Sequence, residues 1–306
     1  KKRFFSYFKI KKLISKYSIN KVFTPYQIAL IFPNVQNILM IRNMEPFNYF
    51  KYKYDIQNRL RNYLLNKFSK YFLKKADTIV AVSKYSEFFL LGNLEIPKDK
   101  IVHIYHGKDV NFSPKIMLND KNVLKKFSLK SNNYILTVGS LLPYRKLEVI
   151  INSYINQTKT FPYLVVAGDG NDKKYKRTIK SLIQKNNLED RVLLLGNVIK
   201  SDLEVLYRNS RIFLTATEVE ACPNIAIESM AFGCTIIAAN TKPLKEIYSN
   251  SAIYFEQDDH KILRENILEI LNNIKKREQM SKISRDRADF FSWDKCSYQT
   301  YKLLND

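Results

Sequence analysis

Short apolar segments alternate with longer segments of helical character along this chain of 306 residues. A first set of apolar segments lies at 19–23, 37–41, 76–83 and 101–109, and a second set at 134–139, 163–170, 191–196, 212–215, 235–238 and 252–255. Strands that alternate with helices at this spacing form βαβ units, which place the strands parallel in a sheet. The sequence therefore predicts an α/β fold with two Rossmann-like, parallel-sheet domains.

Glycine is scarce in this chain, and six of its seven glycines lie at or just beyond the end of a predicted strand or helix. These six are Gly107, Gly139, Gly168, Gly170, Gly196 and Gly233. In such a chain, the glycines that are present mark places where a Cβ atom cannot be accommodated. Ligands of parallel sheets bind beyond the carboxyl ends of the strands. We therefore expect the second set of strands to gather glycine-bearing loops along one binding rim.

The segment 217–233 combines the carboxylates of Glu220 and Glu228 with the predicted start of a helix at Pro223. Pro223 suits the first position of a helix, where its missing N–H is not needed, and Gly233 suits the left-handed residue after a helix end. The unpaired N–H groups of residues 224–226 would face an anion at the helix N-terminus. Glu220 on the preceding loop and Glu228 within the helix could then accept hydrogen bonds from sugar hydroxyls. Carboxylates at this spacing also occur on solvated helix faces.

The net charge of +22 is concentrated at the start of the chain. Residues 1–75 hold 17 lysines and arginines against two acidic residues, Glu45 and Asp55, which is a local charge of +15. Such a segment attracts an anionic partner. We expect this partner to be a membrane surface and do not expect nucleic acid to bind. A solvated basic surface, or a genome rich in lysine codons, gives the same composition. Residues 1–16 fit an amphipathic helix at an interface and equally an ordinary domain helix.

Other bulk features point to a cytoplasmic protein, with peripheral contact to the inner face of the membrane as a further expectation. No segment approaches the roughly 18 uninterrupted apolar residues of a membrane span. Three cysteines give no disulfide framework and no Cys-x-x-Cys pair. Residues 54–75 predict a long helix with a basic side opposite an apolar stripe, made of Leu60, Tyr63, Leu64, Phe68 and Phe72.

The element from Glu220 to Glu228, with Pro223 inside it and Met-Ala-x-Gly after it, resembles the donor-binding signature of the family-4 (group 1) retaining glycosyltransferases. These enzymes have the GT-B fold of two Rossmann-like domains. The resemblance implies that Glu220 acts at the transferred sugar and that Glu228 binds the ribose. It also implies that the loop and helix start face the sugar and diphosphate, through Cys222, Pro223, Asn224 and Ile225.

Further loops of the second set resemble the same family. Gly139-Ser140 and Arg145-Lys146 match its Gly-Arg-Leu-x-x-x-Lys loop, with Arg145 at the lysine position and Ser140 in place of the arginine. The resemblance implies that Arg145 and Lys146 hold the donor diphosphate and that Asn197-Val198 meet the nucleotide base. By the same comparison, residues 1–125 form the acceptor-side domain, 126–289 the nucleotide-sugar domain, and 290–306 a helix that crosses back to the first domain.

In the first domain, Arg42-Asn43 stand where many members carry His-Asp at the cleft, and His106 lies at a turn near the domain boundary. Arginine cannot act as a base at neutral pH, so Arg42 would instead bind an anionic acceptor or the donor phosphates. The family's first domain normally begins with about 70 further residues. We therefore expect an incomplete first domain here.

The resemblance implies a retaining transfer of sugar from a nucleotide-diphosphate sugar to a saccharide or lipid-linked acceptor. No two of the 15 aspartates form an Asp-x-Asp pair, so we expect no metal and no other cofactor. Two alternatives stay open: a nucleotide-sugar 2-epimerase, and a non-catalytic basic protein that binds a membrane or nucleic acid on a degenerate GT-B fold. The sequence does not identify the sugar, the base, the linkage or the oligomeric state.

Overall fold

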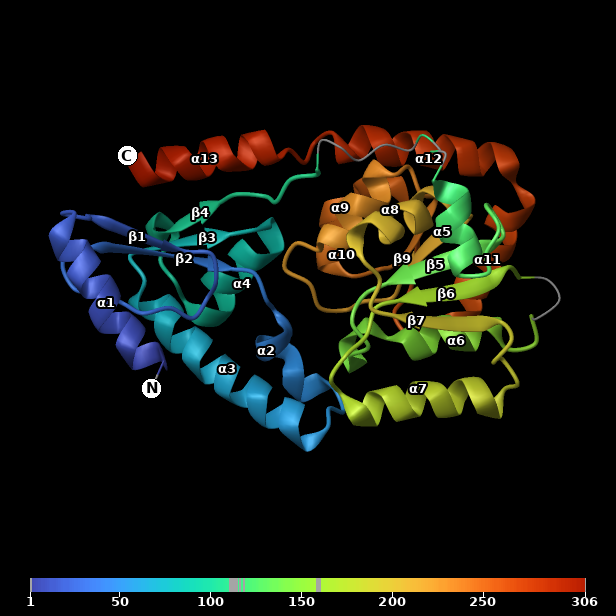
Figure 1. Cartoon of the computed structure of the whole chain (residues 1–306), viewed down its shortest axis with the longest axis horizontal. Helices are drawn as coiled ribbons and strands as arrows, with labels where there is room; N and C mark the ends of the chain where they lie inside the picture. Colours follow the sequence, from blue (N-terminus) through green and yellow to red (C-terminus); the bar gives the residue numbers. More distant parts are fainter. Residues whose placement is uncertain (1, 110–114, 116, 118, 158–160, 306) are drawn as a thin grey trace.

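The computed structural model describes residues 2–109, 115, 117, 119–157 and 161–305. Within these residues the strands form two parallel sheets, and Figure 1 shows them side by side along the long axis, each surrounded by helices. The predicted α/β fold with two parallel-sheet domains is therefore confirmed.

The N-terminal domain is built on four parallel strands in the order β1-β2-β3-β4. The strands are β1 (Lys21–Thr24), β2 (Gln36–Ile41), β3 (Thr78–Ala81) and β4 (Ile101–His103). All of β3 is buried, because a central parallel strand is covered by helices on both faces. The accompanying helices are α1 (Lys2–Lys16), α2 (Glu45–Asn48), α3 (Ile56–Lys75) and α4 (Lys84–Leu94).

The C-terminal domain contains six parallel strands in the order β7-β6-β5-β8-β9-β10. They are β5 (Tyr134–Val138), β6 (Tyr163–Ala167), β7 (Val192–Gly196), β8 (Ile212–Thr215), β9 (Ile236–Ala239) and β10 (Ala252–Phe255). This is the strand order of a dinucleotide-binding Rossmann sheet, and the direction of winding reverses between β5 and β8. Ligands of such sheets bind beyond the carboxyl ends of the strands at that reversal, which places the expected site there.

The helices of the C-terminal domain connect these strands. They are α5 (Asp120–Lys126), α6 (Leu147–Tyr154), α7 (Lys173–Lys185), α8 (Lys200–Asn209), α9 (Asn224–Ala231), α10 (Lys242–Tyr248), α11 (His260–Asn272) and α12 (Ile274–Ala288). Three of them begin at a side chain that accepts a backbone N–H of the first turn, namely Asp172, Asp259 and Asn273. Helix α5 spans the expected domain boundary at residue 125 and packs against α8 through an ion pair between Asp120 and Arg208.

The helix boundaries agree closely with the local signals in the sequence. Ser83 caps α4, and its side chain and that of Ser86 form a reciprocal capping box. Gly233 follows α9 with a φ of +71°, the left-handed conformation expected of a glycine at a helix end. Pro223 is the N-cap residue of α9 and not its first helical residue, a difference of one position.

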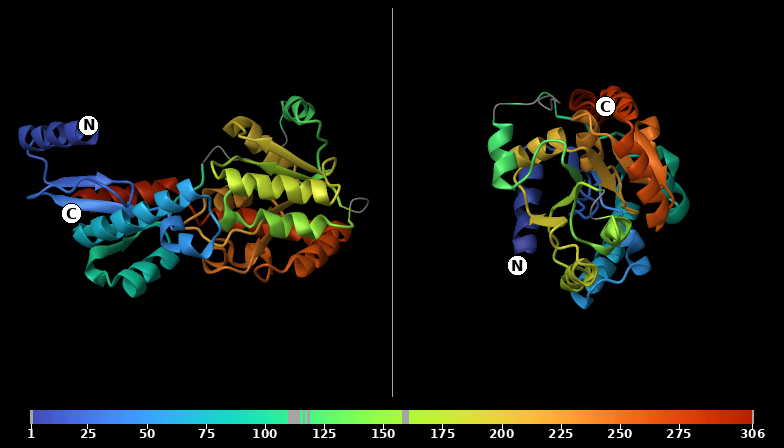
Figure 2. Two further views of the ribbon diagram at one scale, coloured as in Figure 1. Left: turned by 90° about the horizontal axis from the view of Figure 1, so that it is seen from below. Right: turned by 90° about the vertical axis from the view of Figure 1, so that its right-hand side faces the viewer.

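The last helix, α13 (Trp293–Asn305), leaves the C-terminal domain and runs along the N-terminal domain (Figure 1 and Figure 2). The Lys21 ammonium donates to the carbonyl of Leu303 at 3.3 Å, and Lys108 N–H donates to the Phe291 carbonyl at 3.1 Å. The chain can approach this closely at Gly107, because a Cβ atom there would lie 2.0 Å from the Trp293 nitrogen. The C-terminal segment therefore ties the two domains together.

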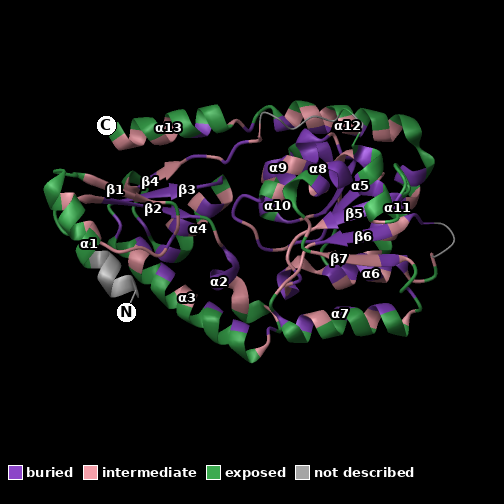
Figure 3. Cartoon of the chain, viewed as in Figure 1, coloured by how far each residue is buried: buried purple, intermediate pink, exposed green. Residues whose placement is uncertain are grey.

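Helix α3 corrects one prediction, because the side opposite its apolar stripe is buried and mainly polar, not basic, while the stripe itself faces solvent. Leu60, Tyr63, Leu64 and Phe68 are exposed and Phe72 is only half-buried, as Figure 3 shows by the exposed outer side of α3. The buried side of the helix instead carries Asn58, Asn62, Ser69 and Leu73. Helical periodicity identifies an apolar face but does not say whether that face packs on the domain.

None of the described helices combines the length and apolar composition that crossing a membrane requires.

Candidate active site

The carboxyl ends of β5, β6 and β7 meet in glycine-bearing loops that pack backbone against backbone. Gly168 N–H donates to the Gly196 carbonyl at 2.7 Å, and Gly139 N–H donates to the Ala167 carbonyl at 3.0 Å. A Cβ atom on Gly168 would lie 2.1 Å from the Gly139 carbonyl oxygen, so no side chain fits there. The expected glycine rim is therefore present at the carboxyl edge of the sheet. The expectation that a Cβ atom cannot be accommodated is wrong for Gly196, which has no atom within 4 Å of its Cβ position and instead adopts a φ of +67°.

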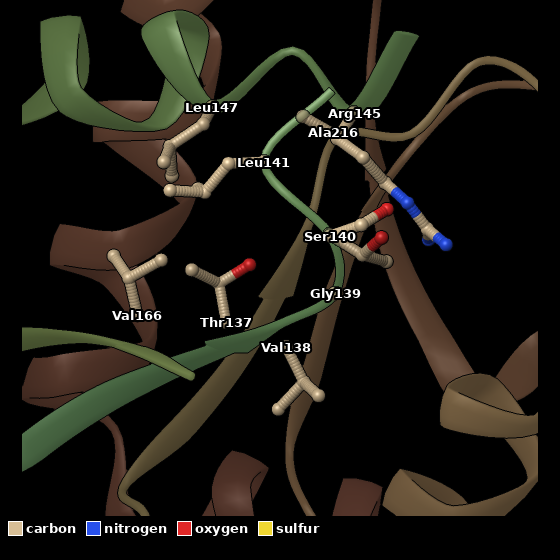
Figure 4. Close-up of a pocket in the computed structure, with 10 residues that line it drawn as sticks. Thr137, Val138, Gly139, Ser140, Leu141, Arg145, Leu147, Val166 and Ala216 are labelled. Atoms are coloured by element: carbon tan, nitrogen blue, oxygen red, sulfur yellow. The ribbon is translucent and has the colours of Figure 1, made fainter. Parts of the chain in front are cut away.

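Beneath the loop that follows β5 lies a hollow of about 20 Å³, lined by residues of β5, β6 and β8 and by Leu141 and Leu147. Gly139, Ser140 and Arg145 also line this hollow, and Figure 4 shows the Arg145 side chain next to Ser140 at one side of it. Such a volume accommodates one water molecule. A nucleotide is too large for this hollow and would have to lie outside it.

Arg145 and Glu220, two of the candidate catalytic residues, form an ion pair with each other. Both side chains are largely buried, and the guanidinium packs against Gly139, where a Cβ atom would lie 3.3 Å from it. Burial raises the pKa of the Glu220 carboxyl, and the Arg145 charge opposes this rise. Burial also acts to lower the pKa of Arg145, but Glu220, Tyr144 and Glu45 together outweigh it and raise that pKa. The pair therefore places a cation and a carboxylate together at the carboxyl ends of β5 and β8.

Lys146, the neighbouring candidate, is held by two carboxylates. Its ammonium lies 2.8 Å from Asp258 Oδ1 and 3.4 Å from Glu218 Oε1. The other oxygen of Glu218 accepts a hydrogen bond of 2.8 Å from the Tyr52 hydroxyl of the N-terminal domain. Sequence reasoning missed Tyr52 and Glu218, since no spacing in the sequence links residues 166 positions apart. Lys146 therefore sits in a chain of contacts that crosses between the domains.

The start of α9 presents two backbone donors. Ala226 N–H bonds to the Pro223 carbonyl at 3.0 Å, so only two of the three expected free N–H groups remain. Within the described part of the chain, no hydrogen bond engages the N–H of Asn224 or Ile225. Asn224 is exposed and Ile225 half-buried, so both amides lie near the surface at the positive end of the helix. An anion bound at the N-terminus of α9 would meet two donors.

Glu228 is oriented by a tyrosine that sequence reasoning did not single out as a site residue. The Tyr207 hydroxyl donates to Glu228 Oε2 at 3.1 Å, and the Tyr207 ring stacks on Phe232 with ring centroids 5.6 Å apart. Burial raises the pKa of the Glu228 carboxyl, and the bond from Tyr207 opposes the rise. One carboxylate oxygen of Glu228 is thus engaged by Tyr207, and the half-buried residue lies one turn into α9.

His106 joins the N-terminal domain to the start of α9. Its Nδ1 is 3.1 Å from Asn224 Oδ1, and its ring stacks on Trp293 of α13 with centroids 5.7 Å apart. Burial, and then the positive charge of Arg42, lower the pKa of His106, while the bond to Asn224 opposes them. A neutral imidazole that carries its proton on Nδ1 donates a hydrogen bond to the amide oxygen of Asn224 in this position. His106 is therefore an interdomain residue, as its place at the turn before the linker indicates.

Arg42 and Asn43 lie beyond the end of β2, where Gln27 fixes the backbone. The Gln27 amide oxygen accepts from the N–H of Arg42 at 3.2 Å and of Asn43 at 3.0 Å, and its amide nitrogen donates to the Asn43 carbonyl at 2.7 Å. Gln27 is completely buried, yet nothing in the sequence pattern marks it as a site residue. Arg42 is exposed, so its guanidinium is accessible to a ligand near His106.

The remaining candidates lie on the same rim or beside α9. Ser140 is half-buried in the loop after β5, and the exposed Asn197 and half-buried Val198 follow β7. Cys222 is buried, and burial raises the pKa of its thiol to about 12, so it is not a nucleophile at neutral pH. In the described part of the chain, no three histidine, cysteine or acidic side chains are placed to hold a metal ion.

Comparison with known proteins identifies the family. Residues 120–287, more than half of the chain, match the family described as "Glycosyl transferases group 1", and residues 2–112 match "Glycosyltransferase Family 4". O-antigen chain mannosyltransferase B of Escherichia coli is 24% identical over 239 residues, which cover 76% of this chain and 62% of that protein.

A second relative is the N-acetylgalactosamine-N,N'-diacetylbacillosaminyl-diphospho-undecaprenol 4-alpha-N-acetylgalactosaminyltransferase of Campylobacter jejuni. It is 28% identical over 247 residues, which cover 79% of this chain and 64% of the relative. The chain thus spans less than two thirds of the length of these relatives. The crystal structure of Anabaena HepE in complex with UDP and glucose is similar in fold, with a TM-score of 0.75 at 16% identity over 89% of this chain and 72% of that one. The chain therefore belongs to the group 1, family-4 glycosyltransferases, and its two parallel-sheet domains have the GT-B fold.

Proposed function

We propose that this chain transfers a sugar from a nucleotide-diphosphate sugar to a saccharide or lipid-linked acceptor, with retention of configuration and without a metal ion. The observation that carries the proposal is the position of the buried Arg145–Glu220 pair at the reversal of strand order, on the loops that precede α6 and α9. A cation and a carboxylate at that edge suit a reaction in which a diphosphate departs from a sugar.

The departing diphosphate requires positive charge where the bond to the sugar breaks. We assign this role to Arg145, to Lys146 and to the free N–H groups at the start of α9. Arg145 contacts Glu220 in the structure, so a donor phosphate would compete with that carboxylate for the guanidinium. Once released, Glu220 could accept hydrogen bonds from the transferred sugar. Donor binding would therefore rearrange this pair rather than fill an open pocket.

We assign the nucleoside to the rim beside α9. Glu228 would accept hydrogen bonds from the ribose hydroxyls through the oxygen that Tyr207 does not engage. Asn197 and Val198, on the loop after β7, would meet the base. The acceptor would approach from the N-terminal domain, where Arg42 is exposed beside His106 and Asn224.

We further propose that the acceptor is held at a membrane, with the protein on its cytoplasmic face. The name of the C. jejuni relative specifies an undecaprenol-linked acceptor, and that of the E. coli relative specifies O-antigen. The strongly basic residues 1–75 suit an anionic membrane surface. A lipid-linked saccharide is therefore the acceptor class that we favour.

The proposal is tested by measuring nucleotide-sugar binding before and after Glu228→Ala, with EDTA present. Loss of hydrogen bonds to a carboxylate should weaken the affinity for UDP- or GDP-sugars by about tenfold or more. Glu265→Ala, which removes an exposed carboxylate on α11, is the matched control and should leave the affinity unchanged. Unaltered binding by Glu228→Ala would remove the ribose assignment, and strict dependence on a divalent ion would remove the mechanism.

Two further measurements separate the alternatives. Incubation of the donor alone, followed by NMR, would reveal an epimerised sugar if the protein were a 2-epimerase. Tight nucleic-acid binding with a steep dependence on salt, together with no affinity for any nucleotide sugar, would instead favour a basic binding protein. Transfer of the sugar to a saccharide acceptor, without epimerisation of the donor and without tight nucleic-acid binding, supports the proposed function.

A further inference from the structure

Helix α3 is built with its apolar side outward. Six large apolar residues of α3 are between 44% and 86% exposed: Ile56, Leu60, Tyr63, Leu64, Phe68 and Tyr71. The spacings of four, three, one, four and three residues keep them on one side of the helix. The opposite side meets the domain through polar contacts, since Asn62 donates to Glu45 Oε1 at 2.9 Å and Asn66 donates to the Pro46 carbonyl at 2.9 Å. A contiguous apolar stripe left in water indicates an interaction surface.

The same helix is strongly cationic. It carries six basic residues and no acidic residue: Arg59, Arg61, Lys67, Lys70, Lys74 and Lys75. Within the described residues, only Arg61 has an ion-pair partner, Glu45, at 3.8 Å. The basic side chains thus lie on the same side of α3 as the apolar stripe, some at its margins and some, such as Lys67 and Lys74, within it. Their long stems allow the charges to reach the lipid head groups while the stripe is buried.

Helix α7 of the C-terminal domain continues this surface. It also has six basic residues and no acidic residue: Lys173, Lys174, Lys176, Arg177, Lys180 and Lys185. Figure 1 shows α3 and α7 one after the other along the lower edge of the molecule, and the left view of Figure 2 faces both. Where the two helices meet lies a groove of about 460 Å³, lined by Tyr54, Asp55, Ile56, Gln57, Lys173, Lys174 and Arg177. The one carboxylate, that of Asp55, accepts backbone N–H groups of Asn58 and Lys173, and three basic side chains outnumber it. We call the exposed side of these two helices the α3–α7 face.

We propose that the α3–α7 face docks the protein on an anionic lipid bilayer, with α3 parallel to the membrane plane and its apolar stripe between the head groups. The groove at the junction would take an anionic head group. An amphipathic helix with aromatic and aliphatic residues on one side and lysines around them has the composition of an interfacial helix. Three stripe residues, Tyr63, Phe68 and Tyr71, are aromatic and suit either bases or a lipid interface. The aliphatic Ile56, Leu60 and Leu64 offer no stacking surface to bases but do bury apolar area in lipid, which favours lipid.

This inference deepens the proposed function, since a lipid-linked acceptor requires the enzyme at a membrane. The face leads to the proposed site: α3 begins four residues after Tyr52, whose hydroxyl bonds to Glu218 beside Lys146. The inference also revises the membrane contact that residues 1–75 suggested, because it selects one helix of that segment and adds α7 from the other domain.

The test is co-sedimentation with vesicles of phosphatidylcholine, with and without phosphatidylglycerol. The wild-type chain should sediment with the anionic vesicles and bind the neutral vesicles far less. Leu60→Ser/Leu64→Ser should weaken binding to the anionic vesicles by about tenfold or more, because it removes apolar area from the interface. Lys174→Glu/Arg177→Glu should remove most of the preference for phosphatidylglycerol.

The matched control is Tyr298→Ser/Tyr301→Ser on α13, which removes two side chains that are more exposed than Leu60 and Leu64 from the opposite edge of the molecule and should leave binding unchanged. All altered positions are exposed, and unchanged thermal unfolding would confirm that the variants are folded. Equal vesicle binding by the α3 variant and the wild type would overturn the inference. So would wild-type dimerisation that Leu60→Ser/Leu64→Ser abolishes, because a second copy would then cover the stripe.

Nucleotide-sugar binding by the same proteins without vesicles separates this inference from the proposed function. Binding of UDP- or GDP-sugars by all variants, with no sedimentation of the wild type on anionic vesicles, would defeat the inference alone. Vesicle binding that depends on α3, in a protein with no affinity for nucleotide sugars, would defeat the proposed function and support the membrane face.

Discussion

Asp55 caps α3 and Asp172 caps α7, and the carboxylate of each also accepts a backbone N–H at the start of the other helix. Asp55 accepts from Asn58 N–H at 2.8 Å and from Lys173 N–H at 3.1 Å. Asp172 accepts from Tyr175 N–H at 2.8 Å and from Asp55 N–H at 2.9 Å. The starts of α3 and α7 are thereby locked together across the domain boundary, although they lie 117 residues apart.

The two carboxylates should stabilise the protein cooperatively. Asp172→Ala removes a cap and an interdomain bond, so we expect a loss of about 1–2 kcal/mol in the free energy of unfolding. The double variant with Asp55→Ala should lose less than the sum of the single losses, because each removes part of the same network. Chemical denaturation of the wild type, the two single variants and the double variant measures the free energy of unfolding of each protein. Additive losses would show that the two caps act independently.

The Asp55 contact should also depend on pH. Burial acts to raise the pKa of its carboxyl, but hydrogen bonds from Asn58 and Lys173 outweigh it and lower that pKa below the ordinary 3.8. A carboxyl with a depressed pKa contributes stability above its unfolded-state pKa and loses it as the pH falls through the folded-state value. Unfolding measured from pH 7 downward should therefore show a smaller acid sensitivity below about pH 4 in Asp55→Ala than in the wild type.

Removal of Glu220 should expose Arg145 to a phosphate ligand. Glu220→Ala leaves a buried guanidinium without its partner, so we expect it to destabilise the protein by about 3 kcal/mol. UDP supplies a diphosphate and no sugar, so it should raise the melting temperature of Glu220→Ala by more than that of the wild type. Sugar transfer should be lost. An equal or smaller UDP-induced shift would argue against Arg145 as the phosphate ligand.

Tyr207 should act as a positioning residue for Glu228. Burial raises the pKa of Glu228 and the Tyr207 hydroxyl opposes that rise, so Tyr207→Phe should raise the pKa further. The carboxylate must be ionised to accept both ribose hydroxyls fully. Donor affinity should therefore fall as the pH decreases, with a midpoint at higher pH in Tyr207→Phe than in the wild type. Calorimetric titration across pH measures this, and identical pH profiles would exclude the role.

Two glycines should respond to alanine in opposite directions. Gly168 has a φ of +135° and its Cβ atom would lie 2.1 Å from the Gly139 carbonyl oxygen, so Gly168→Ala should cost at least about 2 kcal/mol and disturb donor binding. Gly92 lies inside α4 with nothing within 4 Å of its Cβ position. Gly92→Ala should raise the free energy of unfolding by about 0.5–1 kcal/mol. Denaturation curves of both variants test the contrast.

Features that depend on neighbouring residues could be predicted from the sequence alone. The apolar segments predicted both parallel sheets, Gly233 marked the end of α9, and the glycines located the rim after β5. These signals are local: a strand needs an apolar run, a cap needs a side chain of the right length, and a left-handed residue favours glycine.

Tertiary structure alone decided which groups meet and which face is buried. Arg145 pairs with Glu220, Tyr207 with Glu228, and Tyr52 with Glu218, because strand order brings distant loops to one edge. Periodicity likewise located the apolar stripe of α3, but the polar contacts of Asn62 and Asn66 turned it toward solvent. Periodicity fixes the angle between side chains around a helix axis, whereas the packing of the whole domain fixes which side of that axis faces inward.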